Sequence, residues 1–169
     1  HKFNAEMETY LRDELGCKQL INAGNWKTVD PVLCCDAERY SYTANQIIGK
    51  NAYYGSLHAG INTGWQILDQ QVYTNWSALK RPYFWPMNVK QPTGHPMMIF
   101  ESLWVPPNLY AAEGPLLVAG QLSLTGVDSF HWFASGGEEW GDFDGKWAYN
   151  TPMQMGLFPA TSLAFRKGY

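Results

Sequence analysis

The sequence predicts an α/β protein in which short buried strands alternate with amphipathic helices. The clearest strand is residues 97–101, where four apolar residues in a row end on Glu101. The order is one helix, then three strand–helix units, then a strand, a loop and a helix, which is typical of a parallel sheet with right-handed crossovers. Four units are too few for a closed eight-unit barrel, which takes about 250 residues. A small open sheet and half of a barrel therefore both remain open.

Each element follows from a local pattern in the chain. The first helix has its apolar residues on one face and Gly16 just after its end. Asp30 and Pro31 are an N-cap and a proline at the first helical position, so they predict the start of the second helix. Gly114-Pro115 indicates either the true start of the third helix or a kink in it. The predicted strands cover 18–23, 46–53, 97–101 and 127–133, and the predicted helices cover 5–15, 31–44, 108–125 and 152–167.

Residues 55–94 have the weakest periodicity and hold many aromatic residues among glycines and prolines. A segment of this length inside one domain is usually functional or disordered, and the aromatic content favours a functional one. Aromatic rings in loops are flat platforms that suit sugars and other amphipathic ligands. We therefore expect one domain, residues 1–169, with its ligand contacts in loops.

Composition excludes several classes of function. The 169 residues carry a net charge of −3, which argues against nucleic acid or an anionic membrane as a partner. The three cysteines, two of them adjacent, make a poor disulfide framework, and the four histidines lack the spacing of metal ligands. No phosphate-binding glycine motif is present and no apolar run is long enough for a membrane span. We expect no metal and no cofactor.

Four segments of the chain look familiar together: GNWKTVDPVLCCDAERYSYTAN, KNAYYG, HPMMIFESLWVPPNLYAAEGPLLVAGQLSLTGVDSFHWF and PMQMGLFPATSLAFRKGY. They resemble the second half of clan A glycoside hydrolase barrels, close to large members related to β-galactosidases and agarases. The resemblance covers nearly the whole chain and implies strands five to eight of a (β/α)8 barrel with their helices.

The resemblance also implies roles for individual residues. Glu101, in IFES, matches the nucleophile that ends the seventh strand of the clan. Tyr53, in NAYY, matches the tyrosine near that nucleophile, and Trp132, in FHWF, matches the aromatic residue that floors the sugar subsite. The remaining expected sugar contacts are Trp26, Asn51, Tyr54 and Trp104.

One part of the clan pattern is missing. A retaining glycosidase needs two carboxyl groups about 5–5.5 Å apart, and in the clan the acid/base glutamate ends the fourth strand, upstream of this sequence. Glu113 lies in a predicted helix, and Glu138 and Glu139 lie in a predicted solvated loop. The expected acid/base therefore belongs to an N-terminal half-barrel.

Two functions follow as hypotheses. In the first, the chain is the C-terminal half of a retaining glycoside hydrolase that acts on an oligo- or polysaccharide, and it is inactive alone. In the second, it is a non-catalytic carbohydrate-binding or assembly module. A half-barrel has open sheet edges, so we expect it to bind its other half or to self-associate. The sequence leaves localisation open, and a secreted or periplasmic full-length protein is compatible with it.

Overall fold

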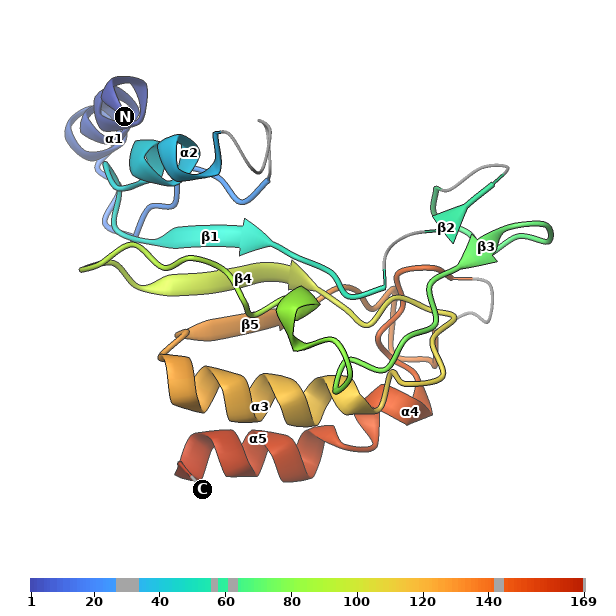
Figure 1. Cartoon of the computed structure of the whole chain (residues 1–169). Coiled ribbons are helices and arrows are strands. Elements are labelled where there is room, and N and C mark those ends of the chain that lie inside the picture. Colours follow the sequence, from blue (N-terminus) through green and yellow to red (C-terminus); the bar gives the residue numbers. More distant parts are fainter. Residues whose placement is uncertain (27–33, 56–57, 61–63, 142–144, 169) are drawn as a thin grey trace.

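The computed structural model of the chain describes all residues except 27–33, 56–57, 61–63, 142–144 and 169. Its centre is a parallel sheet in the order β1-β4-β5, formed by β1 (Ile48–Asn51), β4 (Met97–Ser102) and β5 (Ser129–Trp132). All three strands point toward the end of the molecule that holds the small hairpin of β2 (His58–Ala59) and β3 (Val72–Tyr73) (Figure 1). From one edge of the sheet to the other, the three strands follow in the order in which they occur in the chain.

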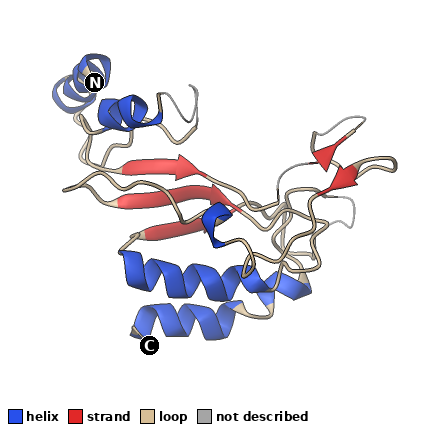
Figure 2. Ribbon diagram, viewed as in Figure 1, coloured by secondary structure: helices blue, strands red, loops and turns tan. Residues whose placement is uncertain are grey.

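The helices flank this sheet on both sides (Figure 2). The pair α1 and α2 lies beside β1, and the pair α3 and α5 lies beside β5. Irregular segments and α4 gather at the carboxyl end of the strands. The bounds are α1 (Lys2–Asp13), α2 (Cys35–Tyr42), the short 3-10 helix η1 (Pro82–Phe84), α3 (Glu113–Thr125), α4 (Pro152–Met155) and α5 (Phe158–Lys167).

The strand predicted over 18–23 does not form. This segment makes a single parallel bridge, between Asn22 and Ile47, at the outer edge of the sheet. Side chains form hydrogen bonds with backbone groups that a neighbouring strand would otherwise bind. Arg12 donates to the Cys17 and Gln19 carbonyls, and the Gln46 side chain accepts from the Ile21 N–H. The described sheet therefore has three strands, with a single bridge in place of the fourth strand at this edge.

All four helices differ from their predicted bounds: the first covers Lys2–Asp13 instead of 5–15. The third begins at Glu113 instead of residue 108, next to the Gly114-Pro115 pair. The last is divided into α4 and α5, because Pro159 lacks an N–H and suits only the first turn of a new helix. The second covers Cys35–Tyr42 instead of 31–44, with Cys34 and Thr43 as its caps, and the predicted N-cap Asp30 and Pro31 lie outside the described residues.

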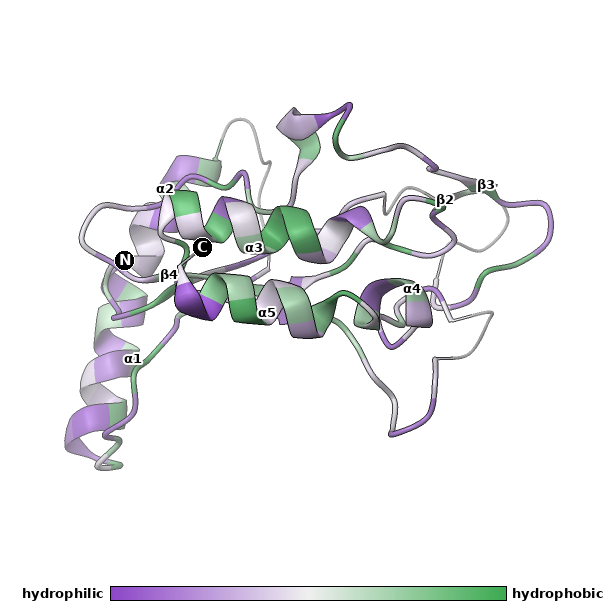
Figure 3. Cartoon of the chain, turned by 90° about the horizontal axis from the view of Figure 1, so that it is seen from below, coloured by the Kyte–Doolittle hydropathy of each residue, from purple (hydrophilic) through white to green (hydrophobic). Residues whose placement is uncertain are grey.

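The main core lies between the sheet and α3. Ile48, Met97 and Ile99 are fully buried and pack with Val118 and Leu122 of α3. In a parallel sheet covered by helices such continuous apolar contact is the main source of stability. Figure 3 shows α3 and α5 side by side beneath the sheet.

The opposite face of the sheet is only partly covered. Phe100 lies across this face: its ring occupies the place that a side chain at Gly49 would need, since a Cβ there would come within 1.8 Å of it. The ring of His131 on β5 lies 5.7 Å from the Phe100 ring. Phe100 and Met98 remain partly exposed and His131 is exposed, so this face presents apolar surface to solvent.

A bulge interrupts the sheet at its carboxyl end. Lys50 pairs with Ile99, but the next residue of β1, Asn51, pairs with Glu101, so Phe100 is an extra residue on β4. The pairing of β4 with β5 has the same extra length between Ile99 and Ser102. A bulge breaks the strict alternation of side chains and re-aims the residues next to it. Glu101 is therefore freed from the helix-covered face that Ile99 occupies.

Among the described residues no helix is both long and apolar enough to cross a membrane.

Candidate functional site

The site centres on a hydrogen bond between Glu101 and Tyr53. The Tyr53 hydroxyl donates to Glu101 Oε2 at 2.6 Å, and both side chains are partly buried. The two residues are 48 positions apart in the chain, and the parallel pairing of β1 with β4 brings them together at the carboxyl end of the sheet. The sheet edge at which parallel strands end is where α/β proteins bind ligands.

Backbone hydrogen bonds extend the pairing past the ends of both strands. The Ala52 N–H donates to the Glu101 carbonyl at 3.0 Å, and the Tyr54 N–H donates to the Leu103 carbonyl at 2.9 Å. Tyr53 lies between these two bonds, so its backbone is fixed relative to Glu101. The geometry of the pair therefore depends on the sheet and not on a free loop.

Aromatic rings surround Tyr53. The ring of Trp147 lies 4.9 Å from the Tyr53 ring and that of Phe133 lies 6.2 Å from it, both edge-on. Trp65 contacts this pair in turn, with its ring 6.1 Å from Trp147 and 6.4 Å from Phe133. We call Tyr53, Trp65, Phe133 and Trp147 the aromatic cluster. The peptide bond between Phe133 and Ala134 is cis.

The surroundings favour the protonated form of Tyr53. Burial raises the pKa of the Tyr53 phenol far above its ordinary value, and the hydrogen bond to Glu101 and the charge of Glu101 raise it further. Tyr53 therefore stays a hydrogen-bond donor to Glu101 across the physiological pH range. In this state it holds one carboxylate oxygen and leaves the other for a ligand.

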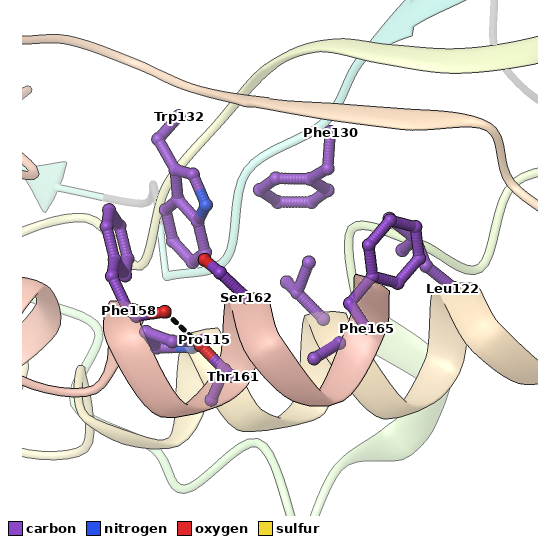
Figure 4. Close-up of a pocket in the computed structure, with 10 residues that line it drawn as sticks. Pro115, Leu122, Phe130, Trp132, Phe158, Thr161, Ser162 and Phe165 are labelled. Carbon is purple, nitrogen blue, oxygen red and sulfur yellow. Dashed lines mark hydrogen bonds between the residues drawn. The ribbon is translucent and has the colours of Figure 1, made fainter. Parts of the chain in front are cut away.

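Trp132 is not brought to this pair. Its ring contacts Phe130 at 4.9 Å, Phe158 at 5.1 Å and Trp104 at 6.2 Å. Figure 4 shows Trp132 and Phe130 directed from β5 toward α5, where they line a cavity of 230 Å³ between the sheet and the helices. Because side chains alternate along a strand, the next residue, Phe133, takes the face of Tyr53 and Glu101. Phe133, and not Trp132, therefore lies beside Tyr53.

Tyr54 and Trp104 lie in the core. Both are almost completely buried, and their rings pack 5.3 Å apart. Tyr54 follows Tyr53 directly, so alternation directs it to the helix side while Tyr53 faces Glu101. Burial raises the pKa of Tyr54, as does the nearby charge of Glu113. Neither residue is placed at a rim where a sugar could stack.

Trp26 and Asn51 have different surroundings. Trp26 is exposed and its carbonyl accepts a hydrogen bond from Lys50 Nζ at 3.3 Å. Asn51 is buried next to Glu101 in the register of β1 and β4, and neither atom of its amide has a partner among the described residues. Buried amides without partners are rare in folded proteins. Asn51 therefore has unused hydrogen-bonding capacity beside Glu101, whereas Trp26 has no described contact with the pair.

The other candidate carboxylates lie elsewhere. Glu113 accepts hydrogen bonds from the Ser77 hydroxyl at 2.7 Å and the Ala78 N–H at 2.6 Å, so it fixes the segment before η1. Glu138 and Glu139 are exposed. Within the part of the chain that the structure describes, Tyr53 is the one hydrogen-bond or ion-pair partner of the Glu101 carboxylate, and no group of three metal-binding side chains is found.

Two adjoining hollows lie near the aromatic cluster, and the first of them is bordered by it. The first, of 420 Å³, is lined by Trp65 and Trp147 of the cluster together with Ala134, Glu139 and Asn150. The second, of 730 Å³, is lined by Pro106, Pro107, Asn108, Leu109, Met153 and Gln154. Trp140, Gly141 and Gly145 line both. We call them the cluster hollow and the proline hollow. Both fall in the size range of small-molecule sites, about 300–1,000 Å³.

Sequence reasoning missed Trp65, Phe133 and Trp147 as members of the site. Phe133 was recoverable, since it alternates with Trp132 at the end of the same strand. Trp147 had no local signal, because it comes to the cluster through a long-range pairing in which the Ala134 N–H donates to the Trp147 carbonyl. Trp65 likewise lies in the segment with the weakest periodicity.

The arrangement provides one carboxylate with a fixed donor, beside aromatic rings and open hollows. A carboxylate held in this way can attack an electrophilic carbon, or can accept hydrogen bonds from a polyhydroxylated ligand. Aromatic rings next to it suit the apolar faces of a sugar.

Comparison with known proteins identifies no relative: no protein-family model, no curated protein and no solved structure matches this chain.

Proposed function

We propose that this chain is a carbohydrate-active half-barrel in which Glu101 is the nucleophile of a retaining glycoside hydrolase. The observation that carries this proposal is the 2.6 Å hydrogen bond from Tyr53 to Glu101 at the carboxyl end of the parallel sheet, within an aromatic cluster. The bond leaves one carboxylate oxygen of Glu101 free to attack. The order of the strands, β1-β4-β5 without reversal, supports a barrel segment over an open doubly wound sheet.

In the proposed reaction a Glu101 oxygen forms a bond to the anomeric carbon while the bond to the leaving oxygen breaks. Water then cleaves the glycosyl ester and restores the carboxylate. Tyr53 positions Glu101 and stabilises its charge. A natural leaving group also needs a proton from a second carboxyl group, and we propose that a polypeptide paired with the open sheet edge supplies it.

The nucleophile can be tested without that second group. Glycosyl fluorides with fluorine also at the carbon next to the anomeric centre lose fluoride with its electron pair, so no acid is required and the intermediate accumulates. We expect such a reagent, in the galactose, glucose or mannose configuration, to leave one sugar on Glu101, detected by mass spectrometry of peptides from the full chain. Glu101→Gln should take up no label because a neutral amide is a poor nucleophile.

The control is Glu138→Gln, which removes an exposed carboxylate of the same size and should label as the unchanged chain does. An adduct on Glu138 or Glu139, or no adduct with any of the three configurations, would contradict the assignment of Glu101.

The second candidate function is sugar binding without catalysis. It is favoured by the fact that Glu101 has no described carboxylate partner of its own. In that case calorimetry should detect reversible binding of a saccharide that Glu101→Gln weakens, while the fluoride reagents leave no covalent adduct.

A further inference from the structure

We propose that the ligand is a saccharide chain of several units, which extends from Glu101 through the cluster hollow into the proline hollow, with Trp140 as a stacking platform between them. This inference rests on the proposed carbohydrate function, and it assigns the class of ligand and a distal subsite that the Glu101–Tyr53 pair alone does not define.

The first support is continuity. Trp147 contacts Tyr53, the partner of Glu101, and also lines the cluster hollow. Trp140, Gly141 and Gly145 are shared by the two hollows, so these adjoin each other. With volumes of 420 and 730 Å³, each hollow is as large as a site for a drug-sized ligand. A single sugar ring bound at Glu101 would leave both unused.

The second support is the kind of surface that the hollows present. The residues Trp65 and Trp140 are 70% and 62% exposed. Exposed aromatic residues gathered around a hollow are typical of a binding site. They offer flat faces to a ligand that is apolar on one side and polar at its rim, which is the character of a sugar ring.

The third support is hydrogen-bonding capacity that the chain does not use. Three amides that line the hollows are more than nine-tenths buried and each has one atom without a partner among the described residues: Asn150 Oδ1, Asn108 Nδ2 and Gln154 Oε1. The other amide atom of each is engaged by backbone, at the Glu139 carbonyl, the Tyr110 N–H and the Trp104 carbonyl respectively. The amides are therefore held in place by the backbone, and one polar atom of each stays without a partner in the walls of the hollows.

The test uses the full chain carrying Glu101→Gln, so that no ligand is consumed. Calorimetric titrations would use ladders of fragments, from two units upward, prepared from galactan, agarose, cellulose and laminarin. For at least one ladder we expect the affinity to rise with each added unit beyond the second. Adding Trp140→Ala should weaken the longest fragments about tenfold, the loss expected for one aromatic contact, and leave the disaccharide unchanged.

Trp76→Ala is the matched control, because Trp76 is also exposed but lines neither hollow and instead stacks on Arg81. It should bind every fragment as the parent does. Trp140→Phe, which keeps a ring, should retain most of the affinity, and this separates loss of the platform from loss of folding.

Affinity that does not depend on fragment length, an equal loss for disaccharide and long fragments in Trp140→Ala, or no binding of any ladder would overturn the inference. Its failure is distinguishable from failure of the catalytic proposal. Binding that depends on fragment length, without covalent labelling of Glu101, would support the distal subsite and contradict the assignment of Glu101 as nucleophile. Labelling of Glu101 without dependence on fragment length would support the nucleophile and contradict the subsite.

Discussion

At the scale of single residues, the site depends on one protonated phenol next to one carboxylate. Burial and the Glu101 carboxylate raise the pKa of Tyr53. The folded state thus binds the phenolic proton more tightly than the unfolded state, in which the pKa is about 10. This contribution to stability is fully present below about pH 10 and is lost as the pH rises toward the folded-state value.

Tyr53→Phe should therefore change the alkaline stability of the protein. At neutral pH it removes a hydrogen bond to a charged group, which costs roughly 1.5–3 kcal/mol in the free energy of unfolding. Between about pH 9 and pH 11 the variant should lose less stability than the parent, because it lacks a phenol whose pKa is raised by folding. Urea unfolding at several pH values measures both effects.

Tyr83→Phe is the control for the alkaline measurement, since Tyr83 is exposed and makes no contact with Glu101. Its free energy of unfolding should change with pH as that of the parent does. If the free energy of unfolding fell with pH equally steeply in Tyr53→Phe and in the parent, Tyr53 would not be the cause of the alkaline loss of stability.

At the scale of elements, β1 is held against α2 by a buried ion pair. Lys50 is 1% exposed and contacts the Glu38 carboxylate, and its ammonium group also lies 4.6 Å from the ring of Tyr42. Burial and the neighbouring Glu38 raise the pKa of Tyr42 to about 12. Removing one partner of such a pair leaves the other charge buried without compensation.

Lys50→Met should thus destabilise the protein by roughly 3–5 kcal/mol, whereas the double variant Lys50→Met/Glu38→Leu should recover most of this loss. Urea unfolding at neutral pH gives both values, and the double-variant cycle gives the coupling between the two side chains. Lys90→Met, which breaks the exposed pair of Lys90 with Asp36, should change stability very little. Additive losses in the double variant would show that the pair is not coupled.

At the scale of the whole molecule, the sheet has a free edge and an incompletely covered face. In the described residues β5 pairs with β4 alone, and on the face opposite the α3 core Met98 and Phe100 are partly exposed and His131 is exposed. Parallel sheets are normally covered on both faces. This surface suits a second polypeptide, either another copy of the chain or the other half of a barrel.

We expect the isolated chain to associate with itself in sedimentation-velocity experiments, with a sedimentation coefficient that increases with concentration. Phe100→Lys should reduce this association, because a charge on the open face opposes pairing with another sheet. The control is Tyr83→Lys, which places a charge on an exposed residue of η1. A parent chain that stays monomeric at all concentrations would contradict the open-sheet interpretation.

The sequence by itself determined the alternation of strands and helices, the strand over residues 97–101, and the position of Glu101 at its carboxyl end. These features depend on local apolar patterns and on strand-end geometry, which a short window of sequence contains. The proximity of Tyr53 to Glu101 was expected through the resemblance, and the structure places the two side chains together.

Only the tertiary structure decided which aromatic residue faces Glu101, and the reason is register. A shift of one residue turns a side chain to the opposite face of a sheet, so Trp132 packs against α5 while Phe133 joins Tyr53. The extra residue Phe100 then frees Glu101 from the face of Ile99, and no local pattern predicts such a bulge. Trp147 and the two hollows depend on contacts between segments far apart in the chain, whose partners a local pattern does not specify.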